Sequence, residues 1–490
     1  MENNNIRECG ILMPISSLHS PYGIGTLGHA AYEFADFLKK SGCTIWQVLP
    51  IGPTGYGDSP YQSFSVFAGN PYFIDLDMLC DFGLLTKSEI DLPDNDLVDY
   101  KAQYDHRFKI LQKAFARFNV TEQDFVEFTQ KHSWWLDNYA LFMSLKNHFG
   151  GVEWQKWPDD VKSGELNEGL ANNLKTECDF WKFLQYHFYS QWEMLKTYCN
   201  QNGIKIVGDI PIYTSYDSAD VFFSPKLFQL DKDKLPTAVA GCPPDAFSQD
   251  GQLWGNPLYD YKYHKRTGYK WWRKRIAHAL EMYDIVRIDH FRGFESYYSI
   301  PYGDKNAKGG HWVKGPDYDL FKKVKRKLGD LNIIAEDLGF IDEKVQSLLD
   351  KTGFCGMKVL QFGFGDDNRN KYLPHEYPKN CICYTGTHDN QTTRSWFDEC
   401  DEKTKKAVCD YLDCDEETVV QSMVKAVISS VAKYAVIPLA DILELDDTAR
   451  INTPSTLGEN WKWRVDGLSL NDENAQKLLK LNQIYGRTNV

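Results

Sequence analysis

The sequence predicts an α/β protein built on a (β/α)8 TIM barrel that carries large, mainly helical insertions. Eight apolar segments are typical of buried strands, and most are separated by segments with helical periodicity. The strands are apolar nearly throughout, which indicates a parallel sheet covered by helices. Five of the eight segments end in acidic residues. The active sites of such barrels lie at the carboxyl ends of the strands, so these acids are expected at one functional rim.

Residues 1–51 are expected to contain strands one and two. Glu8–Ile15 is a short apolar run that ends in a proline turn. His29–Lys40 has apolar residues at helical spacing, and Cys43–Ile51 is a second apolar run. This order of strand, helix and strand predicts the first unit of a parallel sheet.

Residues 52–203 are expected to form an insertion made of a long loop and several helices. Gly52–Leu76 is rich in Gly, Pro, Ser and Tyr, and a loop of this length after a strand is usually functional. Tyr56 and Tyr61 are its candidate binding residues, although a single tyrosine in such a loop more often packs against the loop itself. From Met78 onward the pattern is helical.

The helical part of the insertion is rich in aromatic residues. One stripe with a spacing of three to four positions consists of Phe180, Leu184, Phe188, Trp192 and Leu195. Trp134 and Trp135 are also expected to lie in the core rather than to bind a ligand.

Residues 204–490 are expected to hold strands three to eight, with an inserted cleft loop at about 221–270. The strand segments are Ile204–Val207, Ile285–Ile288, Leu331–Phe340, Gly356–Gly365, Cys381–Asn390 and Tyr434–Leu443. The inserted loop contains Phe247, Gln252, Trp254 and Asn256, and this combination is unusual for a linker.

Composition restricts the possible partners. The net charge is −13 with only short basic runs, which argues against nucleic acid and against an anionic membrane. The N-terminus has no secretory signal and no apolar run is long enough to span a bilayer, so a cytoplasmic protein is expected. The 12 cysteines show no metal or redox spacing, so no metal or cofactor is expected. The aromatic content of 14% suits a neutral sugar, whose apolar face stacks on rings.

The segment DIVRIDHFR, Asp284–Arg292, carries the first sign of chemistry. Because strand side chains alternate, Arg287 and Asp289 share one face and Val286 and Ile288 the other. An aspartate beside a permanent cation stays ionised, as a nucleophilic carboxylate must. Taken alone, this pair is equally consistent with a structural ion pair at a sheet edge.

Two further carboxylates favour catalysis. A retaining glycosidase needs two carboxylates about 5–5.5 Å apart, and neighbouring strands are ~4.8 Å apart. Glu336 ends strand five without a basic neighbour, so burial is expected to raise its pKa as an acid catalyst requires. Asp389 would stabilise positive charge at the anomeric carbon. Metal binding by His388, Asp389, Asp209 and Glu336 is the competing use of these groups, although the strand ends show no HxH pair.

The chain resembles the amylomaltase or disproportionating-enzyme family, the 4-α-glucanotransferases of the α-amylase clan, over nearly its full length. The resemblance is carried by GDSPYQSFSVFAGNPYFIDL, GDIPIY, PPDAFSQDGQLWGNPLY, RIDHFRG, AEDLG, YTGTHDNQTTR and ARINTPSTLGENWKWR. Like this family, and unlike typical α-amylases, the chain shows no separate β-sandwich domain after strand eight.

By position, the resemblance implies that Asp289 is the nucleophile, Glu336 the general acid/base and Asp389 the transition-state stabiliser. The expected substrate-binding residues are Arg287, His388, Tyr56, Tyr61, Asp209, Phe247, Gln252, Trp254 and Asn256. The implied reaction transfers an α-1,4-glucan segment to glucose or a maltooligosaccharide through a covalent glycosyl-aspartate. An α-glucan hydrolase with the same triad and a catalytically inactive glucan-binding protein are the alternatives.

Overall fold

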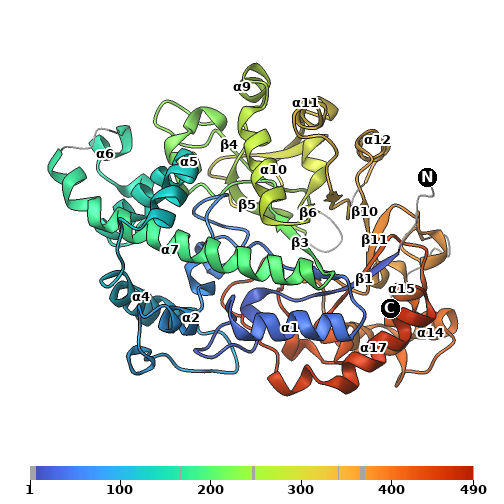
Figure 1. Cartoon of the computed structure of the whole chain (residues 1–490). Helices are drawn as coiled ribbons and strands as arrows, with labels where there is room; N and C mark the ends of the chain where they lie inside the picture. Colours follow the sequence, from blue (N-terminus) through green and yellow to red (C-terminus); the bar gives the residue numbers. More distant parts are fainter. Residues whose placement is uncertain (1–6, 165–167, 245–248, 340, 365–369, 489–490) are drawn as a thin grey trace.

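The computed structural model describes residues 7–164, 168–244, 249–339, 341–364 and 370–488, and Figure 1 shows how the chain is arranged. Eight strands form one parallel sheet. In chain order they are β1 Glu8–Leu12, β2 Ile45–Gln47, β3 Lys205–Ile210, β6 Ile285–Ile288, β9 Ile333–Ala335, β10 Gly356–Val359, β11 Cys381–Tyr384 and β12 Tyr434–Pro438. Each overlaps one of the eight predicted strand segments.

The sheet closes on itself. Its order is β10-β11-β12-β1-β2-β3-β6-β9, so β9 and β10 stand at the two ends. A parallel bridge between Ile334 and Cys355 joins these ends, and the Ala335 amide donates to the Cys355 carbonyl at 2.8 Å. The predicted (β/α)8 barrel is therefore confirmed.

Helices cover the outside of the barrel (Figure 1). The longer ones are α1 His29–Lys40, α10 Lys270–Met282, α11 Tyr318–Leu328, α12 Glu343–Thr352, α14 Glu402–Leu412, α15 Val419–Ser429 and α17 Asp472–Ile484. The short ones are α8 Ala219–Phe223, α9 Tyr261–Arg266, α13 Thr393–Glu399 and α16 Leu439–Ile442. After α17, the buried Arg487 donates to the carbonyls of Glu8 at 3.0 Å and Ala432 at 3.1 Å, which ties the end of the chain to the amino ends of the strands.

The segment between β2 and β3 is helical, and its described residues from 78 to 202 contain no strand. Its helices are α2 Leu76–Asp81, α3 Tyr100–Ala102, α4 Phe108–Phe115, α5 Gln123–His148, α6 Asp159–Ser163 and α7 Glu168–Gln201, with a π-helical turn at Gln103–Arg107. The predicted aromatic stripe on α7 is buried. Trp135 is buried as expected, with 3% of its surface exposed, but Trp134 is 39% exposed, so the expectation that it lies in the core was wrong.

A second, antiparallel sheet of order β5-β4-β7-β8 was not predicted. Its strands are β4 Ala238–Cys242, β5 Gln252–Pro257, β7 Ser296–Pro301 and β8 His311–Lys314. β4 and β5 fall within the segment expected to be a cleft loop, because their glycines and prolines are typical of loops. Alternation places Gln252 and Trp254 on one face of β5, and both are less exposed than Leu253 between them. The register with β4 shifts further along β5, where Gly255 has φ 77° and Asn256 is buried.

Candidate active site

Arg287 is the centre of a buried ion-pair network at the ends of β3 and β6. Its Nη1 donates to Asp209 Oδ2 at 2.5 Å, and its Nη2 donates to Asp289 Oδ1 at 2.9 Å. Burial opposes the guanidinium charge, but the two carboxylates prevail and raise the pKa of Arg287 well above its usual value. The prediction that Arg287 and Asp289 share one face of the strand is confirmed.

The two carboxylates bonded to Arg287 differ in accessibility. The Asp209 side chain is fully buried, whereas 30% of the Asp289 side chain is exposed. Asp209 Oδ1 is also buried and accepts no hydrogen bond from the described residues. Of the two, Asp289 is therefore the carboxylate that a reacting atom can approach.

Glu336 stands beside Asp289 on the neighbouring strand. Ile288 and Ala335 are partners in the register of β6 and β9, and Asp289 and Glu336 directly follow them. Glu336 Oε2 accepts a hydrogen bond from the His290 amide at 2.8 Å, and Oε1 accepts one from the Leu338 amide at 2.7 Å. The left-handed backbone of His290, with φ 51°, belongs to the turn that presents its amide to this carboxyl group.

The environment of Glu336 suits a proton donor. Burial, and then the negative charge of Asp289, raise its pKa from 4.5 to about 7, although Arg287 and the two amides act in the opposite direction. The rise expected from the sequence is confirmed. Near neutral pH this carboxyl group therefore holds a proton for much of the time, while Asp289 is paired with a cation.

Two other acids at the ends of barrel strands have structural contacts. Asp337 points away from Glu336, as alternation predicts, and accepts a hydrogen bond from the Met357 amide at 2.6 Å. Asp441, in the short helix α16 after β12, is 2% exposed and accepts hydrogen bonds from Thr385 and Thr393. An acid at a strand end is thus insufficient evidence of catalysis.

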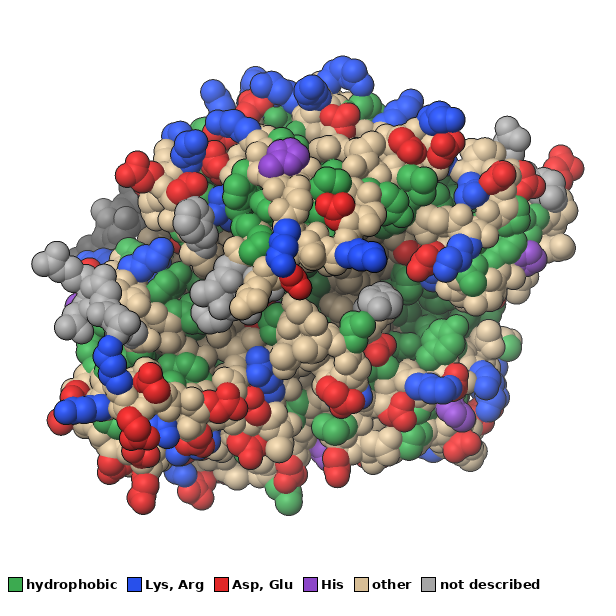
Figure 2. Space-filling model, turned by 180° about the vertical axis from the view of Figure 1, so that it is seen from behind, with side chains coloured by type: hydrophobic (Ala, Val, Ile, Leu, Met, Phe, Trp, Pro, Cys, Tyr) green, Lys and Arg blue, Asp and Glu red, His purple; other side chains and the backbone are tan. Residues whose placement is uncertain are grey.

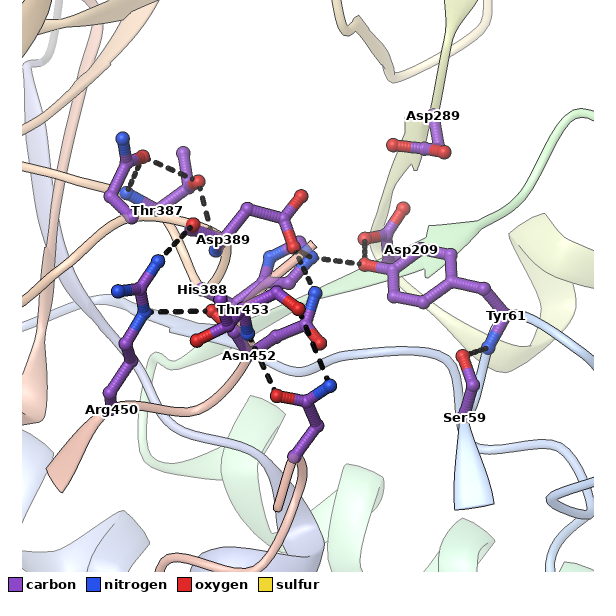
Figure 3. Close-up of polar contacts among 12 residues, drawn as sticks. Ser59, Tyr61, Asp209, Asp289, Thr387, His388, Asp389, Arg450, Asn452 and Thr453 are labelled. Carbon is purple, nitrogen blue, oxygen red and sulfur yellow. Dashed lines mark hydrogen bonds and ion pairs between the residues drawn. The ribbon is translucent and has the colours of Figure 1, made fainter. Parts of the chain in front are cut away.

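Asp389 belongs to a row of polar groups that runs across the end of the barrel (Figure 3). Its Oδ1 lies 3.3 Å from His388 Nε2, which lies 2.9 Å from the Tyr61 hydroxyl. That hydroxyl donates to Asp209 Oδ2 at 2.8 Å, so it must accept from His388, whose Nε2 then carries the proton. The Tyr61 ring also stacks on His388, with centroids 5.4 Å apart. The row connects Asp389 with the Arg287 network.

Asn452 and Arg450 hold Asp389 in place. Asn452 Nδ2 donates to Asp389 Oδ1 at 2.6 Å, and its backbone amide donates to the His388 carbonyl at 3.1 Å. Arg450 Nε donates to the Asn452 carbonyl at 3.0 Å. Neither residue was predicted as part of the site, and the only sign of them was their place in the motif ARINTPSTLGENWKWR.

The β5 wall of the site carries Trp254. Its indole Nε1 donates to Gln252 Oε1 at 3.0 Å, and its ring packs edge-on against His290 with centroids 4.8 Å apart. Asn256 and Gln62 exchange amide hydrogen bonds of 3.1 and 3.4 Å, which fasten β5 to the Gly52–Leu76 loop. His290 and Gln62 were missed by sequence reasoning, because only the fold brings them to Trp254 and Asn256.

Two predicted binding residues cannot be placed. Phe247 lies outside the described residues, and only the backbone of Tyr56 is described. Within the described residues, no group of three or more His, Cys, Asp or Glu side chains is arranged to hold a metal ion. His388 and Asp209, two of the candidate ligands, are instead bonded to Tyr61.

Comparisons with known proteins agree with this geometry. A family model described as 4-alpha-glucanotransferase matches residues 13–470. The chain belongs to the 4-alpha-glucanotransferase family. A 4-alpha-glucanotransferase of Clostridium butyricum is 50% identical over 485 residues, which are 97% of this chain and 100% of the relative. One from Streptococcus pneumoniae is 47% identical over 494 residues, which are 99% of this chain and 98% of the relative.

A solved member of the family shares the whole fold. Amylomaltase from Streptococcus agalactiae in complex with acarbose superposes with a TM-score of 0.95 at 40% identity, over 99% of this chain and all of that one. The chain is thus a 4-α-glucanotransferase, and the resemblance inferred from its motifs is confirmed. In the part of the chain that is described, no helix is long and apolar enough to cross a membrane.

Proposed function

We propose that this 4-α-glucanotransferase moves α-1,4-glucan segments with retention of configuration, through a covalent glycosyl intermediate on Asp289. The observation that carries this proposal is the contrast between two neighbouring carboxyl groups. Asp289 is bonded to a permanent cation, whereas the pKa of Glu336 is raised to about 7 by burial and by Asp289. Such a pair supplies a nucleophile and an acid at the same pH.

In the first step Glu336 protonates the glycosidic oxygen while a carboxylate oxygen of Asp289 attacks the anomeric carbon. The bond between that carbon and the leaving oxygen breaks, and an ester bond to Asp289 forms. The freed end of the donor leaves with the proton of Glu336 as a new 4-hydroxyl group. The negative charge of Asp389 stabilises the positive charge that develops on the sugar ring in the transition state.

In the second step the roles of Glu336 reverse. The ester has removed the negative charge of Asp289, which is one of the causes that raise the pKa of Glu336. The lower pKa favours the carboxylate, which accepts the proton of an acceptor 4-hydroxyl group as that oxygen attacks the anomeric carbon. The ester bond breaks, a new α-1,4 bond forms, and both carboxyl groups return to their initial states.

The polar row is proposed to bind the sugar at the cleavage point. His388, Tyr61 and Arg287 lie around the carboxylates, and the fully buried Asp209 holds Arg287 and Tyr61 in place. The acarbose complex of the amylomaltase from Streptococcus agalactiae supports a site for the same ligand here.

The acceptor is proposed to be glucose or a maltooligosaccharide that lies against the β5 wall. Trp254 offers a ring next to His290, Gln252 lies on the same face of β5, and Asn256 fastens this wall to Gln62. Together with Tyr56 and Phe247, whose side chains are not described, these groups would hold a sugar and exclude water from the intermediate. No cofactor takes part in this scheme.

Incubation with maltotriose tests the proposed function. Transfer predicts glucose together with a ladder of longer maltooligosaccharides, whereas the alternative, an α-glucan hydrolase with the same triad, would only shorten the substrate. An Asp289→Asn protein is the control, because an inactive binding protein would behave identically with and without this carboxylate. Shortening alone would overturn the transferase proposal.

A cytoplasmic location and a three-part organisation are also proposed. All twelve cysteines are free, which suits a reducing compartment. We infer that residues 1–51 and 204–490 build the barrel and that residues 52–203 are an insertion that completes its cleft. Fractionation of cells expressing the protein would test the location.

A further inference from the structure

A cavity of about 580 Å³ lies outside the barrel, between insertion helix α5 and barrel helix α10. Figure 1 shows these two helices in the upper half of the molecule. None of the carboxylates of the proposed active site lines this cavity. Its volume falls within the range of small-molecule sites, which is about 300–1,000 Å³.

Aromatic rings form part of its wall. Trp134, Trp271 and Tyr263 all line the cavity. Trp134 is 39% exposed and packs edge-on against Phe67, with centroids 4.7 Å apart. Because this much of Trp134 is exposed, part of its ring is accessible to a ligand in the cavity.

Three lysines line the same cavity: Lys226 after α8, and Lys270 and Lys274 one turn apart on α10. Lys274 Nζ lies 4.4 Å from the centroid of the Trp134 ring. Burial, and then the charge of Lys270, lower the pKa of Lys274. Among the described residues, no ion pair involves any of these lysines. The carboxylate in the wall, Asp220, accepts a hydrogen bond from the Val66 amide at 3.0 Å.

Apart from the contact of Lys274 with the Trp134 ring, this concentration of positive charge brings the fold no ion pair among the described residues. The protein has a net charge of −13, yet three lysines share this one cavity. Figure 2 shows, separately, Lys and Arg side chains along the upper edge of the molecule, where Figure 1 labels α9 and α11. Like charges one turn apart destabilise a helix. Basic residues in its first turns also oppose its dipole, and α10 has no acidic residue in its first turn. A bound anion would remove both penalties.

We propose that this cavity binds a small molecule that carries a phosphate group on a ring. The phosphate lies between Lys270, Lys274 and Lys226, and the ring packs against Trp134 and Trp271. A sugar phosphate and a nucleotide share this chemistry. A neutral glucan fits less well, because Lys274 covers one face of Trp134 and a neutral sugar brings no charge to compensate for its displacement.

Calorimetric titration of the full-length protein with inorganic phosphate, glucose 6-phosphate and adenosine monophosphate tests the proposal. At least one of the two ring compounds is expected to bind with a dissociation constant below about 1 mM. Lys270→Gln/Lys274→Gln should weaken that binding at least about tenfold. The matched control is Lys323→Gln/Lys327→Gln, which removes two exposed lysines one turn apart on α11 and should change nothing. Trp134→Ser should weaken the binding of the ring compound but not the binding of inorganic phosphate.

The two ring compounds distinguish the two kinds of ligand. Binding of glucose 6-phosphate alone indicates a sugar phosphate, and binding of adenosine monophosphate alone indicates a nucleotide. The proposal is overturned if neither binds below about 1 mM, or if binding is equal in wild type and Lys270→Gln/Lys274→Gln. It is also overturned if Trp134→Ser leaves the binding of the ring compound unchanged. If a variant converts maltotriose at the wild-type rate in the absence of these ligands, it is folded. If Lys270→Gln/Lys274→Gln does not fold, Lys226→Gln is used in its place.

Discussion

The backbone amide of His290 donates a hydrogen bond of 2.8 Å to Glu336 Oε2, which ties the proposed proton donor to the residue that follows the proposed nucleophile. The same residue packs its ring against Trp254. The turn at His290 therefore contacts both Glu336 and Trp254 and directly follows Asp289. A substitution at any of these residues should change the rate of the chemical steps and not only the binding of substrate.

The pH dependence of transfer should report on Glu336. Its pKa is raised to about 7, so the protonated acid is lost as the pH rises through that value, and kcat/KM for maltotriose should fall on the alkaline side. A maltosyl fluoride donor needs no protonation of its leaving group, so its rate of glycosylation should lack this decline. A decline centred near the ordinary value of 4.5 would contradict the assignment.

The stability of Glu336→Gln relative to the wild type should rise with pH. Below pH 4.5 the folded and unfolded wild type are both protonated at this position, so the free energy of unfolding carries no penalty. Between 4.5 and about 7 the unfolded state releases the proton more readily, and above 7 the penalty is complete. The gain for Glu336→Gln should therefore grow over this window to on the order of 1–3 kcal/mol. Urea unfolding at pH 4.5 and pH 8 measures it, and a gain that does not depend on pH would refute it.

Arg287→Met should damage both stability and activity. It leaves Asp209 and Asp289 without their common cation, and breaking a buried ion pair costs about 3–5 kcal/mol. Adding Asp209→Asn removes the fully buried carboxylate, so the double variant should recover part of the stability but none of the activity. Equal unfolding midpoints for the single and double variants would show that the Asp209 contact is unimportant.

Asn452→Ala should reduce transfer through Asp389. The lost hydrogen bond is 2.6 Å long and ends on a carboxylate, so it contributes about 1.5–3 kcal/mol, which is about 10- to 150-fold in kcat/KM. Asn452→Asp places a second carboxylate against Asp389 and should be worse than Ala. If the Asn452→Asp protein were as active as the Asn452→Ala protein, Asn452 would not act by holding Asp389.

Trp254→Ala should raise the ratio of hydrolysis to transfer, or raise the KM for the acceptor, because the ring that holds the acceptor and excludes water is gone. Leu253→Ala is the matched control, since Leu253 is on the opposite face of β5 and is 39% exposed. Quantifying free glucose and longer products from maltotriose gives the ratio. The same ratio in wild type and Trp254→Ala would refute a role in acceptor binding.

Much of the fold could be predicted because buried parallel strands are apolar throughout, and all eight were found from this pattern. The pairing of Arg287 with Asp289 followed from alternation along a strand. β4 and β5 could not be found in this way, because their Gly and Pro residues resemble a loop. They pair with each other although they are close in sequence, and only the partner on the other side of β4, β7, is distant. The combination of Gln252, Trp254 and Asn256 in β5 could still be recognised from the sequence as unusual for a linker.

Residues that act on the catalytic groups from a distance in sequence were harder to predict. Asn452 lies 63 residues beyond Asp389, and nothing in its local pattern indicates the contact. Asp441 shows the reverse problem, because an acid at a strand end can be fully occupied by threonines. Trp134 was expected in the core together with Trp135, but adjacent residues of a helix point in different directions.

The most direct test of the account is to trap the intermediate on Asp289. In Glu336→Gln a maltosyl fluoride donor can still react, since fluoride leaves without a proton, but no base remains to activate the acceptor. We expect the intact protein to gain the mass of one maltosyl residue, and peptide mapping to place it on Asp289. An adduct on another residue, or a product of inverted configuration without any adduct, would contradict the account.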